Sequence, residues 1–316
     1  MTQRTGVRTI LIPSRPCQWK QEIYLGREVE FVPVGVRGVS RTDVAGELVQ
    51  RFAQLLPSRP RSPANRFDFF TPLGRIYREM REFVELAGAT CWSAEAVPWV
   101  AEASTEALSR VRVAAHGQTV VLCHTPSDYH DYISNGKGPA HSTGCHYNML
   151  SPRPLGTDKA RKFAELVSSL NAVFGTGGLA WSTDGAPRLC CDPRAHHVAC
   201  LVGGSAHGDA PKPFFLSRNE PYARPPSERL QCAAFGSPRS PLSSWLQAEL
   251  LALALRAVLG RRIPPWCVAD PLEALRAGPE EPIALRRTRL GRSKSIAKAE
   301  LAVKSHFVPG WSAVGQ

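Results

Sequence analysis

The sequence has 316 residues and a mass of 34.5 kDa, the size of one large domain or two ordinary ones. Hydrophobic residues make up 43% and charged residues 21%, a globular composition that excludes a chain disordered throughout. The net charge of +12 suggests an anionic partner such as a nucleotide or an acidic protein. No RNA- or DNA-binding motif is found, so nucleic acid is a disfavoured partner.

Cysteine usage and hydropathy set further limits. The sequence has nine cysteines but no C-x-x-C pair, so no structural zinc site is expected, and free thiols in a reducing cytoplasm fit best. No run of about 18 apolar residues occurs, so we expect no transmembrane helix and no membrane partner. The basic N-terminal segment lacks an apolar stretch, so no signal peptide is expected.

The first third of the chain contains one ambiguous segment. Alternating polarity predicts a strand over 21–34, and apolar periodicity predicts a helix from Thr42 to Leu56. The proline-rich stretch 57–63 is predicted to be a loop. Residues 67–89 fit either one helix or two short strands, 74–80 and 81–87, and the sequence alone does not decide between them.

The remaining elements mix helices and short strands. Predicted helices cover 93–111, 157–173 and 243–259, and predicted strands cover 119–124, 188–191, 197–202, 214–218 and 230–235, with a glycine-containing loop at 134–142. From 286 to 304 seven basic residues face one acid, which predicts a basic tail or a solvated surface helix. Because no regular βαβ rhythm is present, we predict an α+β fold with an antiparallel sheet.

Two glutamates stand out in the first predicted strand. Glu28 and Glu30 are two residues apart, so both side chains project from one face of the strand. Carboxylate oxygens are the ligands that magnesium prefers, and magnesium commonly accompanies nucleotide phosphates. The alternative is an exposed strand face with two solvated glutamates.

A second group of polar residues follows at 74–85. If this segment is a strand, Arg75, Tyr77 and Glu79 share one face, with Glu85 six residues further on. Such a face offers a phosphate ligand, a phenol and a carboxylate in a row. If the segment is instead an amphipathic helix, the same charges lie in water.

The stretch 135–148 is the third candidate, because its glycines allow the backbone to approach a ligand closely. It also gathers four polar side chains, Lys137, His141, His146 and Asn148. Arg194 and Arg218 each lie at the end of a predicted strand, and an arginine fork matches phosphate or carboxylate oxygens.

Taken in order, these segments resemble the Pup ligase and depupylase family of carboxylate–amine ligases. The family's G-x-E-x-E-[FY], R-x-Y-x-D, H-P-E-Y, G-K-G-A-x-x-G-x-H-E-N-Y-L, S-Q-R-A-E-H, N-T-R-D-E-P-H-A and R-L-H-V-I-x-G-D motifs have counterparts in the same order across 22–260. The matching residues are Gly26, Glu28, Glu30, Phe31, Arg75, Tyr77, Glu79, Glu85, Gly136, Lys137, Gly138, Gly144, His146, Asn148, Leu150, the segment 192–197, Arg218, Glu220, Pro221, Ala223, Arg229 and Leu230.

The resemblance implies a glutamine-synthetase-like catalytic domain over 1–262, in which a curved antiparallel sheet with helices on one face binds ATP and magnesium. A short basic C-terminal segment, 263–316, follows it. By the same resemblance the residues fall into three groups: metal ligands Glu28, Glu30, Tyr77 and Glu85; nucleotide contacts Arg75, Arg194, His146 and Asn148; and catalytic residues Glu79 and Arg218.

The sequence departs from the family pattern at several positions. Glu79 replaces the family's catalytic aspartate and is one methylene longer. The H-P-E-Y segment reads Phe-Val-Glu-Leu at 83–86, and H-E-N reads His-Tyr-Asn at 146–148. The family's C-terminal domain, which binds the Pup tail, has no recognisable counterpart.

Three functions therefore remain open. The first is an ATP- and magnesium-dependent carboxylate–amine ligase that forms an amide or isopeptide bond through an acyl phosphate. The second is an inactive nucleotide-binding or protein-interaction module, and the third is a depupylase-like amide hydrolase. The short span between Glu28 and Arg75 is more typical of the ligase branch. Expected partners are a nucleotide, an acidic Pup-like protein or a small carboxylate or amine, and a second polypeptide that completes the site.

This interpretation makes a geometric prediction. One face of the sheet should bring together the two strand glutamates, the phenol, the third glutamate and the histidine: Glu28, Glu30, Tyr77, Glu85 and His146. Arg75, Arg194 and Arg218 should lie around this group. A continuous surface helix over 74–88 would contradict the resemblance for that segment.

Overall fold

A mainly antiparallel sheet of ten strands organises the part of the chain that the structure describes. In this computed structural model the described residues are 23–34, 38–80, 82–113, 120–124, 143–181, 186–203, 212–218, 223, 225–238, 240–260, 266–277 and 285–287. The strands pair in the order β10-β11-β12-β7-β1-β5-β4-β3-β2, and β6 pairs with β1. They are β1 (Tyr24–Val34), β2 (Arg59–Ser62), β3 (Asn65–Thr71), β4 (Gly74–Glu79), β5 (Phe83–Gly88), β6 (Val121–Cys123), β7 (Cys145–Ser151), β10 (Val198–Gly203), β11 (Lys212–Arg218) and β12 (Glu228–Phe235).

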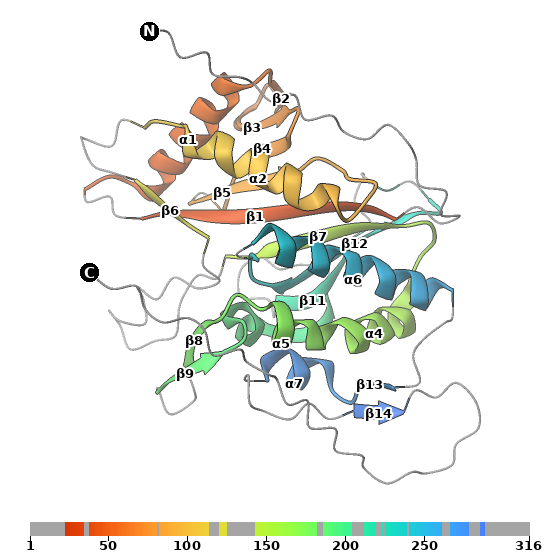
Figure 1. Ribbon diagram of the computed structural model, residues 1–316. Coiled ribbons are helices and arrows are strands. Elements are labelled where there is room, and N and C mark those ends of the chain that lie inside the picture. The colour runs from red at the N-terminus through yellow and green to blue at the C-terminus, as the bar shows by residue number, and fades with distance from the viewer. Residues whose placement is uncertain are drawn as a thin grey trace, which may run out of the picture.

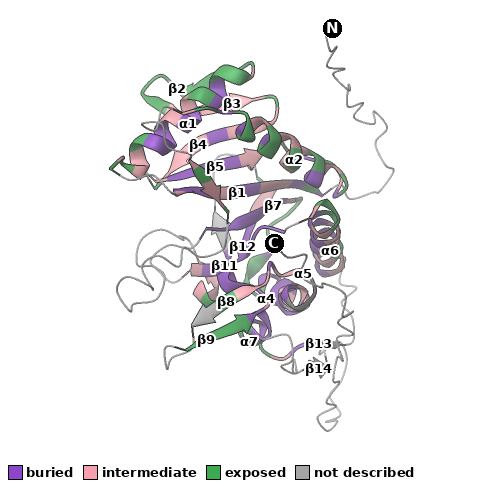
Figure 2. Ribbon diagram, turned by 60° about the vertical axis from the view of Figure 1, so that its left-hand side comes forward, coloured by how far each residue is buried: buried purple, intermediate pink, exposed green. Residues whose placement is uncertain are grey.

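The long helices cover one face of this sheet. Helix α1 (Arg41–Leu55) packs on β1, β4 and β5, and helix α2 (Ala96–Ser109) packs on β1 and β5. Helix α4 (Gly156–Val167) packs on β10, and helix α6 (Pro241–Leu259) packs on β7. Figure 1 shows the two pairs side by side along the sheet, and Figure 2 shows α4 and α6 on the same side of β11 and β12. The predicted α+β fold with helices on one face is confirmed.

Shorter elements complete the description. The turns η1 (Ser168–Leu170) and η2 (Pro193–His197) and the helices α5 (Asn171–Phe174) and α7 (Pro271–Arg276) flank the β10 end of the sheet. Two small antiparallel pairs are formed by β8 (Gly178–Trp181) with β9 (Pro187–Cys190) and by β13 (Trp266–Val268) with β14 (Leu285–Arg287). Because β13 contacts α4 and α7 contacts β10, residues beyond 262 also pack on the sheet and its helices.

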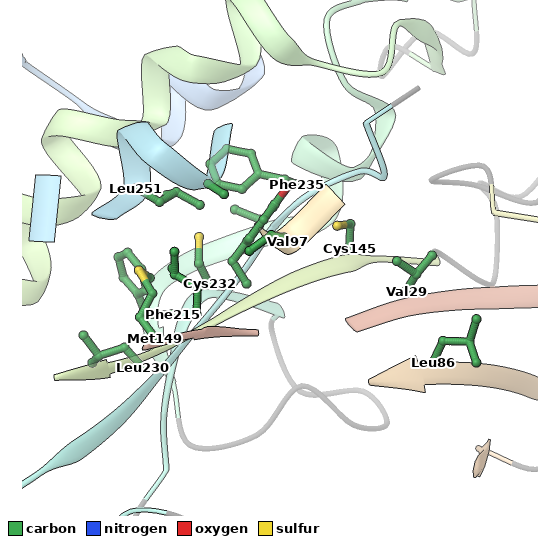
Figure 3. Packing of buried hydrophobic residues seen from close by; sticks show 14 of the residues in the cluster. Val29, Leu86, Val97, Cys145, Met149, Phe215, Leu230, Cys232, Phe235 and Leu251 are labelled. Atoms are coloured by element: carbon green, nitrogen blue, oxygen red, sulfur yellow. The ribbon is translucent and has the colours of Figure 1, made fainter. Parts of the chain in front are cut away.

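Strand alternation separates the core from the site. On β1, Leu25, Val29 and Phe31 are buried under the helices, so the side chains of Glu28 and Glu30 project from the opposite, open face. The apolar core runs along the helix side of the whole sheet, and Figure 3 shows side chains of this cluster from several strands and helices, among them Val29, Leu86, Val97, Met149, Phe215, Phe235 and Leu251. Burying these side chains provides the main driving force for holding the sheet against its helices.

The ambiguous segment at 67–89 forms strands, not a helix. Strands β4 and β5 pair antiparallel, with Gly74 opposite Gly88 and Glu79 opposite Phe83. The expectation of a loop at 57–63 is wrong, because residues 59–62 form β2. This strand lies at the end of the sheet order, and an edge strand tolerates Pro60, which has no N–H to donate to a neighbour.

The other predicted elements are largely present. The helices and strands expected between residues 93 and 259 correspond to α2, β6, α4, β9, β10, β11, β12 and α6. One finding was not expected: β10 and β11 run parallel, whereas every other described pair in the sheet is antiparallel. The predicted loop at 134–142 lies outside the described residues, as does most of the basic segment 286–304.

Helix α6 is the most apolar long helix. Ser240 caps it by accepting a hydrogen bond from the Ser243 N–H, and Pro241 occupies the first turn. By length and composition alone the helix could cross a membrane, and it is the one such helix in the described chain. Its contacts with α2, α4 and β7 are those of a core helix. None of the eight described cysteines forms a disulfide with another described residue.

Candidate metal and nucleotide site

Strand register brings the predicted site residues together on the open face. Glu30 of β1 lies opposite Glu85 of β5, and Glu85 lies opposite Tyr77 of β4, so these three side chains form a row across neighbouring strands. Glu28 of β1 lies opposite His146 of β7. Residues opposite each other in a sheet project from the same face. The predicted convergence of these five side chains is therefore confirmed, while their roles stay predictions.

The centre of the group has the donor geometry of a cation site. Glu28, Glu85 and His146 each offer a ligand atom, and these atoms lie within 4.8 Å of one another. All three residues are buried, with exposed fractions of 8%, 3% and 7% in that order. Two buried carboxylates and an imidazole close together suit a divalent cation, because the cation would neutralise charges that water does not reach. The residues present therefore fit the magnesium ion that the sequence resemblance implies.

Glu28 is held by three neighbours. Its Oε1 accepts a hydrogen bond from Arg229 Nη2 at 3.1 Å, and its Oε2 accepts one from Gln231 Nε2 at 2.6 Å. His146 Nδ1 lies 3.5 Å from the same Oε2. Burial by itself would raise the pKa of Glu28, but the interactions with His146 and Arg229 outweigh it, so that the pKa is lowered. Glu28 is therefore ionised even without a metal ion.

Glu85 has the opposite electrostatic environment. Burial raises its pKa well above the usual value, and the negative charges of Glu28 and Glu30 raise it further. Among the principal interactions of Glu85, only the hydrogen bond with Tyr77 lowers its pKa. The pKa of Tyr77 is in turn raised by burial and by the charge of Glu85. Without a cation, Glu85 therefore holds its proton to a higher pH than a solvated glutamate.

The third glutamate, Glu30, lies on the side of the cluster that faces η2. Its Oε2 accepts a hydrogen bond from the Gly144 backbone N–H at 2.6 Å, and its Oε1 lies 4.0 Å from His146 Nε2. Arg194 Nη2 lies 3.4 Å from the same imidazole nitrogen. Glu30 and Arg194 therefore flank His146 on the side away from Glu28.

Arg194 is buried and rigidly placed. Its Nε donates to the Ala233 carbonyl at 3.2 Å, and its backbone N–H donates to Asp192 Oδ1 at 2.9 Å. The other oxygen of Asp192 accepts from the Gly236 N–H at 2.7 Å, which ties the start of η2 to the end of β12. Burial raises the pKa of Asp192 to about 6. The prediction that Arg194 lies beside the site is confirmed, and Asp192 is a support that the sequence analysis did not identify.

Gly144 leaves no room for a side chain. A Cβ atom at this position would lie 2.5 Å from His146 Nε2 and 3.2 Å from Arg194 Cζ. We expect Gly144→Ala to push these side chains apart, to destabilise the protein by about 1–3 kcal/mol, and to weaken magnesium–nucleotide binding in calorimetry. Gly26→Ala is the control, because its Cβ would meet nothing closer than 3.9 Å. Equal effects of the two substitutions would contradict the prediction.

Arg75 forms a strong pair of its own. Its Nε and Nη2 donate to the two oxygens of Asp68 at 2.6 and 2.7 Å, and its guanidinium stacks on Tyr77 at 3.8 Å from the ring centroid. Asp68 lies opposite Tyr77 on β3, so the pair extends the polar row towards the sheet edge. A phosphate that binds to Arg75 must therefore share the guanidinium group with Asp68. Asp68 was not predicted as a partner of Arg75 from the sequence.

The remaining predicted residues occupy the periphery. Asn148 accepts a hydrogen bond from Arg229 Nε at 2.8 Å and so helps to orient the arginine that holds Glu28. Glu79 ends β4 two residues beyond Tyr77 on the same face, immediately before Met80 with φ of 44°. Arg218 ends β11 opposite Arg229, and the described structure places only its backbone.

Two contacts of Glu28 were not predicted as site residues. Arg229 and Gln231 alternate on β12, which pairs with β7 and not with β1. Because the two residues are two positions apart on a strand, their side chains are predicted to share one face of the sheet. Arg229 also belongs to a motif that matches the family pattern. Only the strand order, however, brings the two side chains to Glu28. Gln231 also lies 3.3 Å from His146 Nδ1, and its Oε1 has no hydrogen-bond partner among the described residues.

Comparisons with known proteins identify the fold. The scan of family models and the search of curated proteins each found no match. Among solved structures, the chain resembles the Pup ligase PafA in its complex with the prokaryotic ubiquitin-like protein Pup, with a TM-score of 0.60, 17% identity and 84% of this chain covered. The structure of PafA with ADP matches with a TM-score of 0.52, 18% identity and 80% coverage.

The sheet, its helices and its open face therefore define a glutamine-synthetase-like fold. Within that fold, the chain is similar to Pup ligase PafA, at an identity that establishes the architecture alone. The matched region covers 54% of each PafA chain, so this chain spans about half the length of the ligases that it resembles.

Proposed function

We propose that the chain is an ATP- and magnesium-dependent ligase that joins a carboxylate to an amine. The observation that carries the proposal is the buried group of Glu28, Glu85 and His146 on the open face of a ligase-like sheet. Its support comes from the arginines beside it, because Arg194 and Arg229 offer cationic groups next to the carboxylates. ADP in one of the matched PafA structures supports a nucleotide as the ligand.

The proposed reaction has two steps. The substrate carboxylate attacks the terminal phosphorus of ATP, and ADP leaves, which gives an acyl phosphate. An amine then attacks the acyl carbon, phosphate leaves, and an amide or isopeptide bond forms. Glu79 takes the proton that the amine loses. Magnesium, when bound, would neutralise phosphate charge, and Glu28, Glu85 and His146 would hold it.

The roles of the surrounding residues follow from their contacts. Arg229 and Gln231 hold Glu28 in its ionised form, so the cluster needs no proton release from this residue when a cation binds. Arg194, buried beside His146, would contact the nucleotide phosphates. In this scheme Asn148 and Asp192 act as positioning residues through Arg229 and Arg194.

A carboxylate on an acidic Pup-like protein is the proposed donor, because the chain carries a net charge of +12 and PafA is seen with Pup. A small carboxylate is the alternative donor. The free cysteines are compatible with a cytoplasmic location.

One observation favours a second candidate, an inactive nucleotide-binding module. Both oxygens of Glu28 already accept hydrogen bonds from Arg229 and Gln231, which occupy positions that a metal ion could use. In this alternative the arginine neutralises Glu28 permanently. The site would then bind nucleotide weakly or without magnesium, and no turnover would follow.

Glu79→Gln tests the ligase proposal and the role of Glu79 as a base. A panel of carboxylates is incubated with magnesium and ATP, and the acyl phosphate is captured either by an alkyl amine or by hydroxylamine. An alkyl amine is protonated near pH 7 and needs a base, whereas hydroxylamine is mostly neutral. We expect Glu79→Gln to lower amide formation about a hundredfold and to leave hydroxamate formation nearly unchanged.

The outcomes separate the two candidate functions. Absence of both products in the wild-type protein, with nucleotide still bound in calorimetry, would favour the inactive module. Equal loss of both products in Glu79→Gln would show that Glu79 does not act as the base. Glu82→Gln is the matched control, because this acid lies outside the strand, in the turn that follows Glu79.

A further inference from the structure

Gln231 of β12 reaches into the cation cluster with only one end of its amide group held. Its Nε2 donates a hydrogen bond to Glu28 Oε2 at 2.6 Å and lies 3.3 Å from His146 Nδ1. Its Oε1 is buried and accepts no hydrogen bond from any described residue. The residue as a whole is 5% exposed. Because buried polar atoms in folded proteins nearly always have a partner, the free oxygen of Gln231 points to a partner that binds from outside the chain.

The neighbours of the amide determine which of its ends faces Glu28. Glu28 is paired with Arg229 at 3.1 Å, and the oxygens of an ionised carboxylate only accept hydrogen bonds. The amide nitrogen therefore faces Glu28 in the metal-free protein, since an amide oxygen in its place would be repelled by the carboxylate. A cation between the two groups reverses this preference, because it attracts both oxygens.

The end of the amide forms a triangle with two candidate ligand atoms. Gln231 Nε2 lies 2.6 Å from Glu28 Oε2 and 3.3 Å from His146 Nδ1, and these two atoms lie 3.5 Å apart. Ligand atoms that share a magnesium ion at about 2.1 Å in octahedral geometry lie about 3 Å from their neighbours. The amide therefore occupies a corner suited to a ligand atom. It places nitrogen there, which is no ligand for magnesium because its lone pair is delocalised into the carbonyl group.

We propose that Gln231 has two states: its amide nitrogen holds Glu28 in the metal-free protein, and its amide oxygen ligates the cation in the loaded protein. The inference rests on the proposed function, because the cation is the magnesium ion that the ligase needs. Half a turn about the last side-chain bond exchanges the two atoms without moving the backbone. Because Oε1 has no described partner, the turn breaks only the contacts of Nε2, and the cation–oxygen contact offsets their loss.

The same exchange frees Glu28 for the cation. In the metal-free protein Glu28 Oε2 accepts the hydrogen bond from Gln231, so this oxygen is occupied. Once the amide has turned, its oxygen and the carboxylate oxygen both face the cation. The hydrogen bond from Gln231 then acts as a substitute for the cation and does not block the site.

Nuclear magnetic resonance tests the proposal in protein whose glutamine side-chain amides carry stable isotopes of carbon and nitrogen. The signal of Gln231 is identified by its absence in Gln231→Met. A cation on an amide oxygen withdraws electrons from the carbonyl group, so we expect added magnesium to move the Gln231 carbonyl carbon downfield. Its amide protons, released from the carboxylate, should move upfield. Gln247 of α6 is the internal control, because it is also buried and its amide has no described partner, but it lies on the helix side of the sheet.

Calorimetry with magnesium measures what Gln231 contributes to affinity. We expect Gln231→Met, which keeps the length of the side chain but has no amide, to weaken magnesium binding about tenfold to a hundredfold. Gln247→Met is the matched control and should leave the affinity unchanged. Thermal unfolding of each variant shows whether it is folded. Gln231→Asn, one methylene shorter, withdraws the amide from the cluster and serves both measurements if Gln231→Met does not fold.

The outcomes separate this inference from the proposed function. Magnesium binding that leaves the Gln231 carbon signal unmoved, or that Gln231→Met does not weaken, would overturn the two-state role and leave the ligase proposal standing. Magnesium binding that moves the signal, without amide or hydroxamate formation, would overturn the ligase activity and leave Gln231 as a ligand. A wild-type protein that binds no magnesium, with or without nucleotide, would overturn both.

Discussion

Glu28→Gln is expected to weaken magnesium-dependent nucleotide binding strongly. The substitution keeps the shape of the side chain but removes the charge that Arg229 and Gln231 hold at 3.1 and 2.6 Å. It also removes one of the three ligands grouped within 4.8 Å of one another. Loss of a carboxylate ligand and of its pairing with Arg229 should weaken binding of magnesium–ATP at least about a hundredfold in calorimetry.

The control for Glu28→Gln is Glu47→Gln on α1. Glu47 forms a partly exposed ion pair with Arg51 on the helix side of the sheet, so its loss should leave nucleotide binding unchanged and alter stability by less than about 1 kcal/mol. Retention of magnesium-dependent binding in Glu28→Gln would show that the cation binds elsewhere. Binding that is unaffected by chelating magnesium, in both the wild type and the variant, would favour the module in which Arg229 neutralises Glu28.

The local pattern of polar and apolar residues was sufficient to predict many of the helices and strands. The alternation on β1 predicts a strand, and the long run of helix-forming leucine and alanine residues in α6 predicts a helix. The sequence of residues 67–89 is ambiguous, because the spacing of its charged and apolar residues fits both the 3.6-residue period of a helix and the two-residue period of a strand. Here pairing of β4 with β3 and β5 decides the outcome, and pairing is a non-local interaction that a single sequence does not display.

Strand β2 was missed for a related reason. The strand contains Pro60, and Pro57 and Pro63 lie on either side of it, so the segment has the composition of a loop. Arg59 and Pro60 nevertheless lie opposite Phe70 and Phe69 of β3. The guanidinium of Arg59 packs over the Phe70 ring at 5.4 Å from its centroid. At a sheet edge one side of the strand needs no partner, so proline costs less there than in a central strand.

The candidate site was predictable where residues lie close in sequence. The spacing of Glu28 and Glu30, and of Tyr77 and Glu85 across a hairpin, follows from strand geometry. The contacts from Arg229 and Gln231 depend on the order β12-β7-β1, which no local pattern specifies. The opposite pKa changes of Glu28 and Glu85 depend on which cations reach each carboxylate, so they too require the three-dimensional structure.

This electrostatic contrast supports the proposal that the site binds a cation. Arg229 and His146 neutralise Glu28, whereas the principal charges acting on Glu85 are the other glutamates, Glu28 and Glu30. The metal-free protein therefore carries a buried acid that is costly to ionise. A divalent cation at the cluster would remove this cost, so the proposed metal binding would be coupled to folding stability through Glu85.

Glu85→Gln should accordingly stabilise the metal-free protein and eliminate its response to magnesium. In the folded state the pKa of Glu85 lies above its unfolded value, so the folded protein holds the proton more tightly. Stability of the wild type should therefore fall as pH rises from about 4.5 through the folded pKa, by about 1.4 kcal/mol for each pH unit that separates the folded and unfolded pKa values. Glutamine does not ionise, so the variant avoids this loss above that range.

Thermal unfolding at about pH 5 and about pH 7.5, with magnesium or with a chelator, measures both effects. We expect the chelated wild type to lose stability at the higher pH relative to Glu85→Gln, and magnesium to raise the unfolding temperature of the wild type alone. Glu165→Gln is the matched control, because Glu165 is also buried but is paired with Arg161 at 3.3 Å on α4. That variant should keep the magnesium response and gain no stability, since its carboxylate already has a cationic partner. A magnesium response that persists in Glu85→Gln would place the cation away from β5 and leave the buried proton of Glu85 as a purely structural feature.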